Sequence, residues 1–189
     1  MSTVLITGGT GLVGKSLGRA LLEKGYRVII LTRDPDSQES IPGITYASWD
    51  IRRQIIDPKA IAEADHIIHL AGASVAEKRW TDKRKQEILN SRVQSGQLIL
   101  KGLREIPNQV KSVISASAIG WYGPDPVIPN PQPFKESATV ATDFLGSTCR
   151  QWEESRPCHL DDHPLDVARK PWHLLASRIR VRCDRHGQR

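Results

Sequence analysis

The sequence predicts an α/β fold, a doubly wound parallel sheet with helices on both faces. Three observations support this prediction. Short apolar runs typical of buried strands alternate with segments of helical periodicity, the first run leads directly into a glycine turn, and 189 residues suit a single core. The alternation breaks off near residue 154, where a further strand is due. We therefore expect the sheet to lack its C-terminal strands.

The first strand leads into a turn suited to a dinucleotide. Residues Val4–Gly14 read VLITGGTGLVG, in which Gly8, Gly11 and Gly14 are spaced three apart. A diphosphate needs converging backbone N–H groups, and only residues without a Cβ let the chain approach it so closely before a helix begins. The alternative is a glycine turn kept for packing alone.

A helix and a second buried strand complete this first unit. Residues 15–24 carry leucines at helical spacing, Gly25 supplies a stop, and Arg27–Thr32 (RVIILT) has the composition of a buried strand. Together with the first strand they form a right-handed βαβ unit. This is the context that a dinucleotide-binding glycine turn requires.

Further strands and helices follow in alternation. Strands are expected at Ile44–Ser48 (ending at Trp49–Asp50), at His66–Ala71 (closed by Gly72) and at Val110–Ser115. Helices are expected at Pro58–Ala64, at Thr81–Glu105 and from about Ala141 to Glu154. Five prolines between residues 124 and 133 exclude regular structure there.

Charge gives little support for a nucleic-acid partner. The formal charge is +6, but residues 155–189 hold eight Lys or Arg against four Asp, which leaves 19 minus 17, or +2, for residues 1–154. The charged run of the long helix is expected to be an exposed, solvated face. That run contains Lys83, Arg84, Lys85 and Glu87.

Other classes of protein are excluded by composition. No apolar run reaches the roughly 20 residues of a membrane span, and the N-terminus lacks a signal-type segment, so we expect a cytoplasmic protein with no membrane partner. The three cysteines, Cys149, Cys158 and Cys183, have neither disulfide-framework nor zinc spacing. They are expected to be free thiols, and no metal site is predicted.

The chain changes its nature at about Ser155. The remaining residues hold four of the six histidines and seven arginines with only a faint apolar period, so they do not resemble the domain before them. Two interpretations remain open: a poorly ordered basic tail, or a shift of reading frame near residue 155, which we favour. The expected organisation is a dinucleotide-binding domain over 1–154 and an aberrant basic tail over 155–189.

Several motifs resemble the extended short-chain dehydrogenase/reductase superfamily. They are TGGTGLVG (Thr7–Gly14), HLAG (His69–Gly72) and SASAIGWYG (Ser115–Gly123). The residues Arg79–Trp80, Ser91–Arg92, Asp143–Phe144 and Gln151–Glu153 look more narrowly like the atypical epimerase branch, the SDR39U-type epimerase family proteins, in places called cell-division inhibitor-like. The resemblance covers residues 1–154, about the cofactor-binding half of such proteins.

This resemblance implies a Rossmann domain and a set of cofactor-binding residues. The diphosphate would be held by Thr7, Gly8, Gly9, Thr10, Gly11, Leu12, Val13 and Gly14, and flanked, with the adenosine ribose, by Leu70, Ala71 and Gly72. Asp50 would lie near the adenine and Ser117 on the nicotinamide side. Arg33 ends the second strand, where an arginine pairs with a 2′-phosphate, so NADP is favoured over NAD. Asp34 follows at once, and the alternative for Arg33 is an exposed loop residue.

The proton relay expected from the resemblance is missing. The superfamily uses a tyrosine whose pKa is lowered by a lysine four residues later, but Tyr26, Tyr46 and Tyr122 are followed at that spacing by Ile30, Asp50 and Pro126. Phe144 and Thr148 stand near where the pair would fall. Ser117 and Tyr122 are the remaining catalytic candidates, and Tyr122 has a packing role beside Trp121 as its alternative.

Three functional hypotheses follow. The first is an NADP-preferring oxidoreductase or epimerase for an unidentified carbonyl or sugar-like substrate, with weakened or no catalysis. The second is a non-catalytic nucleotide-sensing regulator that acts on a partner such as the division machinery. The third is a broken gene product, whose uncovered apolar helix faces would make it aggregate.

Overall fold

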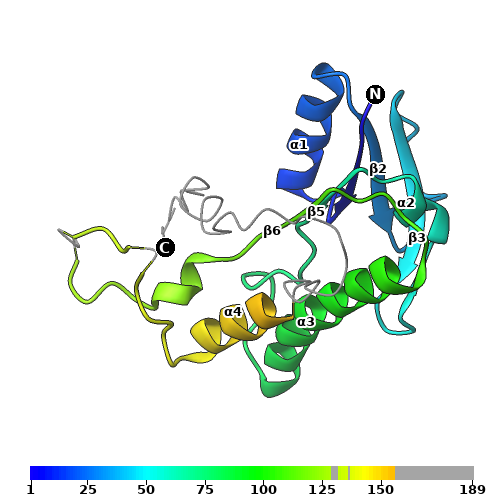
Figure 1. Ribbon diagram of the computed structural model, residues 1–189. Helices are drawn as coiled ribbons and strands as arrows, with labels where there is room; N and C mark the ends of the chain where they lie inside the picture. Colours follow the sequence, from blue (N-terminus) through cyan, green and yellow to red (C-terminus); the bar gives the residue numbers. More distant parts are fainter. Residues whose placement is uncertain (129–131, 136, 156–189) are drawn as a thin grey trace.

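The computed structural model describes residues 1–128, 132–135 and 137–155, and its centre is a six-stranded sheet in the order β4-β3-β2-β1-β5-β6 (Figure 1). The strands are β1 (Thr3–Thr7), β2 (Arg27–Thr32), β3 (Ile44–Asp50), β4 (Ile55–Ile56), β5 (His66–His69) and β6 (Ser112–Ser115). All neighbouring strands are parallel except β3 and β4. The predicted parallel sheet is thus confirmed, with one antiparallel edge strand added.

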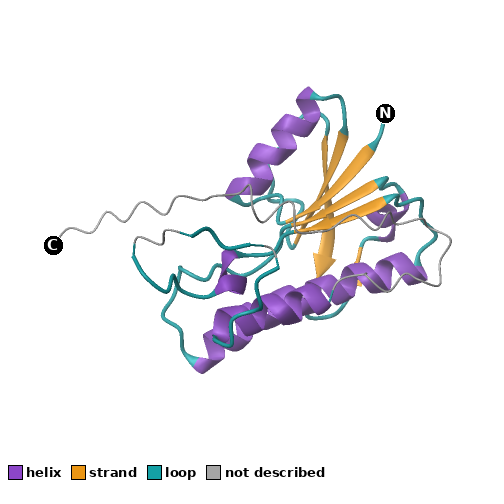
Figure 2. Ribbon diagram, turned by 60° about the vertical axis from the view of Figure 1, so that its left-hand side comes forward, coloured by secondary structure: helices purple, strands orange, loops and turns teal. Residues whose placement is uncertain are grey.

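Helices cover both faces of this sheet. They are α1 (Leu12–Glu23), α2 (Pro58–Ala62), α3 (Asp82–Glu105), α4 (Phe144–Glu154) and the 3-10 turn η1 (Ile119–Tyr122). Figure 2 shows α1 on one side of the strands and the long α3 on the other. Helix α4 packs against α3 and η1 rather than on the strands. The doubly wound arrangement expected from the sequence is confirmed.

Two separate cores explain why the first strands are continuously apolar. Successive side chains of a strand point to opposite faces, so Val4 and Ile6 pack beneath α1, whereas Leu5 packs with residues of α2 and α3. The same division applies to Ile30 and Ile29 in β2. Because each face has its own cover, the positions between Thr3 and Thr7 in β1 and between Arg27 and Thr32 in β2 are all apolar.

The order of the strands places the switch point of the sheet at the carboxyl end of β1, and we call the region there, between Gly8–Gly14 and Leu70–Gly72, the crevice. From β1 the chain moves outward through β2 and β3, and then returns to place β5 on the other side of β1. In sheets of this type the loops that follow the two central strands leave in opposite directions, and ligands bind in the gap between them. The glycine turn lies at this point.

Several element boundaries differ from those expected. Helix α1 begins at Leu12 instead of Lys15, because Gly14 is itself helical. Strand β4 was not expected; it pairs antiparallel with the end of β3 through a turn in which Gln54 has φ of +55°. No helix joins β2 to β3, so β3 has one exposed face and alternates buried and exposed residues instead of being buried throughout.

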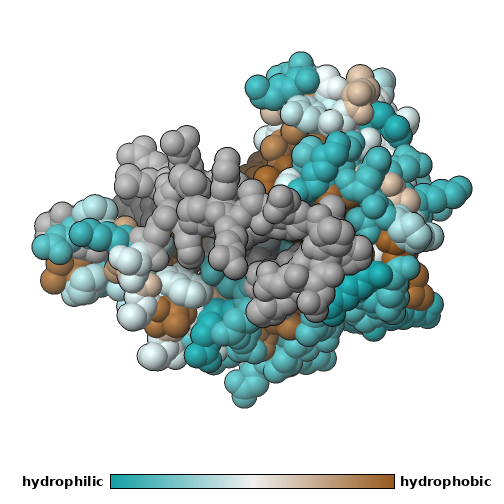
Figure 3. Space-filling model, viewed as in Figure 1, coloured by the Kyte–Doolittle hydropathy of each residue, from teal (hydrophilic) through white to brown (hydrophobic). Residues whose placement is uncertain are grey.

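The charged run of α3 is only partly exposed. Seen as in Figure 1, the surface over α3 is mainly hydrophilic (Figure 3), as a solvated helix face should be. The prediction that Arg84 is exposed is nevertheless wrong, since its side chain is 6% exposed. Arg84 lies four residues before the buried Ile88, on the same helical face, and its charge is matched by Glu77 and Glu87 at 3.5 and 2.7 Å.

The remaining sequence predictions concern the tail and the membrane. Apart from Ser155, the predicted tail and two of the cysteines, Cys158 and Cys183, lie outside the described residues. Cys149 is a buried free thiol, as expected. Within the described ranges, no helix combines the length and the apolar character that crossing a bilayer demands.

A buried carboxylate ties together the amino ends of three strands. Asp65 accepts a hydrogen bond from the Thr3 amide at 2.9 Å and from the Lys111 ammonium at 2.7 Å. These bonds connect β1, β5 and the start of β6. The hydrogen bond from Lys111, followed by that from Thr3, holds the pKa of the Asp65 carboxyl below its ordinary value.

We expect Asp65→Asn to lower the free energy of unfolding at pH 7, and the difference from wild type to close as the pH falls below about 4. A carboxyl with a lowered folded-state pKa stabilises the fold above its unfolded pKa, and this contribution is lost as the pH falls through the folded value. Urea unfolding from pH 3 to 8 measures it. Glu63→Gln, which removes the half-exposed ion pair with Arg27, is the control and should change little. A difference that stays constant down to pH 3 would contradict the role of Asp65.

Candidate dinucleotide-binding site

Three glycines shape the turn between β1 and α1, each for a different steric reason. Gly8 has φ of +71°, and its carbonyl accepts a hydrogen bond from the Gly11 amide at 3.1 Å. A Cβ on Gly9 would lie 2.7 Å from Ile30 Cγ2, and a Cβ on Gly14 would collide with the Gly8 carbonyl oxygen. A side chain at Gly14 would push α1 away from the turn, and one at Gly9 would displace Ile30 of β2.

The first turn of α1 is open toward the crevice. Its N-cap, Gly11, offers no side-chain hydrogen bond, and the turn contains no acidic residue. Thr10, Gly11, Leu12 and Val13 are all exposed, and Leu12 is 84% exposed in spite of its apolar side chain. Free amides at the positive end of a helix are suited to an anion, so the residues present fit a diphosphate group.

The opposite wall of the crevice is the chain segment that follows β5. The amides of Leu70 and Ala71 both donate to the Thr7 hydroxyl at 3.2 Å, and the Leu70 amide also donates to the Thr7 carbonyl at 3.1 Å. A Cβ on Gly8 would lie 2.9 Å from the Leu70 carbonyl carbon. The predicted residues Gly8–Gly14 and Leu70–Gly72 are therefore brought together, as expected for a shared ligand.

Helix α3 holds the loop that continues from this wall. The Ser91 hydroxyl accepts from the Ala73 amide at 2.9 Å, Arg92 donates to the Ala73 carbonyl at 3.1 Å, and Arg84 donates to the Ser74 carbonyl at 2.6 Å. The prediction assigned no role to these α3 residues. They could have been recognised in the sequence as polar side chains that recur at helical spacing on the face that also carries Ile88.

Arg92 brings a positive charge to the edge of the crevice. A Cβ on Gly72 would lie 3.0 Å from the Arg92 Cζ, so a side chain at this position would crowd the guanidinium. The same Cζ lies 5.1 Å from the Trp152 ring centroid. Burial lowers the pKa of the Arg92 guanidinium, but an arginine stays protonated at neutral pH. Arg92 was not among the predicted site residues.

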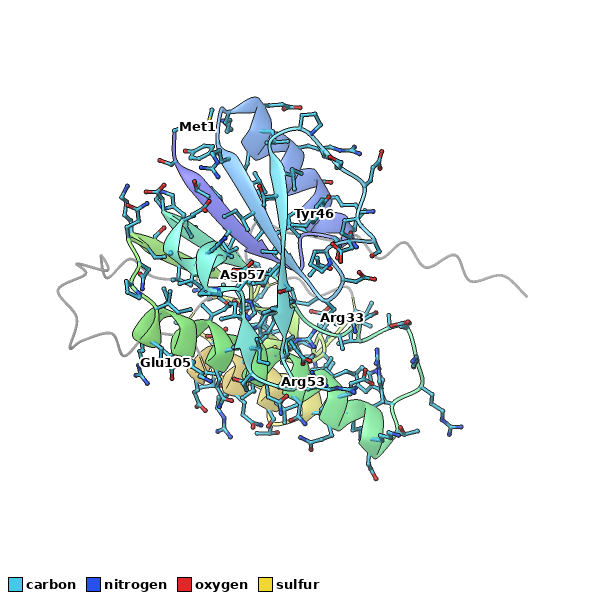
Figure 4. All side chains as sticks on the ribbon, turned by 90° about the vertical axis from the view of Figure 1, so that its right-hand side faces the viewer. Met1, Arg33, Tyr46, Arg53, Asp57 and Glu105 are labelled. Carbon is cyan, nitrogen blue, oxygen red and sulfur yellow. The ribbon has the colours of Figure 1, made fainter. Side chains whose placement is uncertain are left out.

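The two residues predicted on the adenosine side have different surroundings. Arg33 is exposed where the chain leaves β2, toward the same end of the sheet as Arg53 (Figure 4), and no carboxylate of the described residues forms an ion pair with it. Asp50 at the end of β3 accepts from the amides of Arg52 and Arg53 at 2.9 and 3.0 Å. Arg33 is thus available to a ligand, whereas Asp50 already closes its own turn.

The two catalytic candidates have separate partners. The Ser117 hydroxyl donates to the Glu153 carboxylate of α4, a residue that the prediction did not assign to the site. The ring of Tyr122 stacks on Phe134 with centroids 5.1 Å apart and planes 15° apart. A packing contact of Tyr122 is therefore present, with Phe134 as the stacking partner.

The start of α4 offers no tyrosine and lysine. Phe144 is its first residue and packs edge-on against Trp80 at 5.5 Å, while the Thr148 hydroxyl donates to the Phe144 carbonyl at 2.7 Å. Cys149 follows; burial raises the pKa of its thiol, which keeps it protonated near neutral pH. Helix α4 thus lacks, at the expected positions, both the tyrosine that acts as the acid and the lysine that lowers the pKa of that tyrosine.

Comparison with known proteins agrees with this geometry. The family model described as the NAD dependent epimerase/dehydratase family matches residues 4–148. An epimerase family protein of Staphylococcus saprophyticus is 37% identical over 153 residues, which cover 81% of this chain and 49% of that protein. A Staphylococcus aureus relative is 35% identical over the same share. The chain spans about half the length of the curated relatives it matches.

Solved structures share the fold. The crystal structure of human epimerase family protein SDR39U1 with NADPH aligns with a TM-score of 0.63 at 24% identity, over 81% of this chain and 48% of that one. A UDP-glucuronic acid 4-epimerase of Bacillus cereus in complex with NAD aligns with a TM-score of 0.66 at 20% identity, over 87% and 54% of the two chains. At these identities the likeness shows the Rossmann-like fold alone.

We expect Gly14→Ala to abolish binding of a dinucleotide, because the added methyl group collides with the Gly8 carbonyl and displaces α1. Gly18→Ala is the matched control on the same helix, since its Cβ would meet Ile44 at an ordinary 3.8 Å and alanine favours the helix by up to about 1 kcal/mol. Titration with NADPH and thermal unfolding of both variants test this expectation. Equal binding by the two variants would show that the turn does not hold the ligand.

Proposed function

The chain belongs to the NAD dependent epimerase/dehydratase family, and from this premise we propose that it binds NADP(H) in the crevice and carries out hydride transfer on a carbonyl or sugar-like substrate. The observation that carries the proposal is the turn Gly8–Gly14, whose uncapped helix end opens toward the carboxyl ends of β1 and β5. A closed or acid-capped turn would have argued against a diphosphate.

Each wall of the crevice would hold a different part of the ligand. The amides of the glycine turn, with Thr7 and Thr10 beside them, would bind the diphosphate, and the exposed Leu12 and Val13 would cover its nicotinamide side. Leu70, Ala71 and Gly72 would flank the adenosine ribose and the diphosphate. The Asp50 carboxylate already accepts hydrogen bonds from two amides of the turn that follows β3. Asp50 would therefore contact the adenine only from the edge of that turn.

The preference for NADP rests on Arg33. Its guanidinium is exposed at the end of β2 and has no ion-pair partner among the described residues, so it can pair with a 2′-phosphate. An acidic residue at the end of this strand would instead accept hydrogen bonds from a free ribose hydroxyl. Asp34 is the only acidic neighbour in sequence, and its backbone amide lies 3.4 Å from the Thr32 hydroxyl.

The proposed chemistry is the transfer of a hydride and a proton. The nicotinamide would supply or accept the hydride when bound. Ser117 would hydrogen-bond the substrate oxygen on the nicotinamide side, and Tyr122 would donate or accept the proton, in place of the missing tyrosine and lysine of α4. In the free protein the Ser117 hydroxyl donates its single proton to Glu153, so it would have to turn from this carboxylate to the substrate oxygen when the substrate binds.

Nucleotide binding without turnover is the second candidate, and it is favoured by a specific observation. Phe144 and Thr148 occupy the first turns of α4 and are engaged in packing and in a helix hydrogen bond, so neither can transfer a proton. Under this hypothesis the bound dinucleotide would act as a ligand that stabilises one state of the protein. The two candidates predict the same binding and differ only in turnover.

Replacement of Arg33 by alanine should weaken NADPH binding at least about tenfold and leave NADH binding unchanged, because only the 2′-phosphate contact is lost. Nicotinamide fluorescence, with the shift of the thermal midpoint, measures both affinities. Arg27→Ala is the matched control, since Arg27 lies at the opposite end of the same strand and pairs with Glu63. Equal loss for both cofactors would remove the argument for NADP.

Ser117→Ala should lower turnover by a factor of about 100 or more while NADPH binding stays within about threefold of wild type. The assay is NADPH oxidation with a broad panel of carbonyl compounds. Ser112→Ala, at the opposite end of β6, is the control. A wild-type protein that binds NADPH but is inactive across the panel would favour the non-catalytic candidate.

A further inference from the structure

We propose that His69 is the positioning residue of the dinucleotide crevice. With its proton on Nε2, the neutral imidazole directs the Thr7 hydroxyl and thereby fixes the two chain segments that flank the diphosphate. This inference rests on the proposed function in that crevice, and His69 is not among the predicted site residues.

The surroundings of Thr7 show which group donates to which on one side of the ring. The Thr7 oxygen lies 3.2 Å from the amides of both Leu70 and Ala71, and these groups can only donate. The two lone pairs of the hydroxyl are therefore used. Its own proton must go elsewhere, and His69 Nδ1 lies 2.6 Å away. Nδ1 is thus the acceptor and carries no proton.

Ser95, on the other side of the ring, gives the same result independently. The Ser95 hydroxyl donates to the Arg92 carbonyl at 2.9 Å, which uses its single proton. His69 Nε2 lies 3.2 Å from the same oxygen, so Nε2 must donate to it. Both ends of the imidazole therefore indicate the same neutral form, with the hydrogen on Nε2.

Burial makes this arrangement specific. Thr7 and Ser95 are fully buried, and His69 is 2% exposed. A buried polar network with every member satisfied has one hydrogen-bonded arrangement, and exchanging a donor for an acceptor leaves a group without its partner. A doubly protonated ring would direct a third N–H group at the Thr7 oxygen, which already receives two.

The position of the network connects it with the ligand. Thr7 and His69 are paired across the sheet as the last residues of β1 and β5, and Ser95 belongs to α3. Gly8 follows Thr7 directly, and Gly72 follows Ala71, so a shift of the Thr7 side chain moves both walls of the crevice. His66 is a useful contrast at the other end of β5, where its Nδ1 lies 2.8 Å from the Ser112 hydroxyl, far from the turn.

Two amide replacements separate the two hydrogen bonds of the ring. In His69→Asn the side-chain oxygen stands near the position of Nδ1 and can still accept from Thr7, whereas in His69→Gln the longer amide reaches Ser95 and the Thr7 contact is lost. We expect His69→Asn to keep NADPH affinity within about threefold and His69→Gln to weaken it at least about tenfold, with similar losses of thermal stability in the two variants. His66→Asn and His66→Gln are the matched controls and should leave the affinity unchanged.

The tautomer is measured without any nucleotide. The wild-type protein with 15N-labelled histidine is measured by long-range 1H–15N correlation at pH 7. The signals of His69 are identified because they are lost in the His69 variants. They should show the pattern of a neutral ring protonated at Nε2. A ring protonated at Nδ1, or a charged ring, together with normal NADPH binding, overturns the positioning role alone. Equal weakening by His69→Asn and His69→Gln also overturns it and leaves a structural role. The expected tautomer in a protein that binds neither NADPH nor NADH overturns the proposed function, and the positioning role with it.

Discussion

The rest of the crevice depends on how closely the backbone segments approach one another at the carboxyl end of β1. Side chains are excluded from Gly8, Gly9 and Gly14 by a neighbouring main chain or by Ile30, so the turn has one geometry available to it. That geometry aims the amino end of α1 at the crevice and lays its leucines over Val4 and Ile6. A steric constraint on a few atoms thus determines both the site and one of the two cores.

Helix α3 is the polar counterpart of this constraint. Its second half packs apolar residues such as Leu98 and Ile99 against the sheet, whereas its first half presents Arg84, Ser91 and Arg92 to the loop after β5. That loop has no strand to hold its carbonyl and amide groups, so side chains of the helix satisfy them. The same helix therefore stabilises the sheet and holds one wall of the crevice in place.

The parts that could be predicted from the sequence are those in which the signal is local. The apolar runs of β1 and β2, the glycine spacing and the helical period of α3 each lie within a few residues. Strand β4 could not be predicted, because two isoleucines have no period and pair only after β3 is in place. Arg84 was expected to be exposed because of its charge, although Ser74 and Glu77, which it contacts, lie 10 and 7 residues before it. The network of His69 was missed because Thr7 and Ser95 are 62 and 26 residues away in sequence. For Arg84 the spacing to Ile88 was the better guide.

The small antiparallel strand β4 also limits how this sheet can be extended. Ile55 and Ile56 pair with Trp49 and Asp50 of β3, so a further parallel strand on this side would find the carboxyl end of β3 already paired. Among the described strands, β6 is left as the edge that runs parallel to its neighbour. A parallel strand that pairs along the full length of an edge, from the same chain or another, would therefore enter beside β6, next to Ser117 and on the far side of the sheet from Arg33.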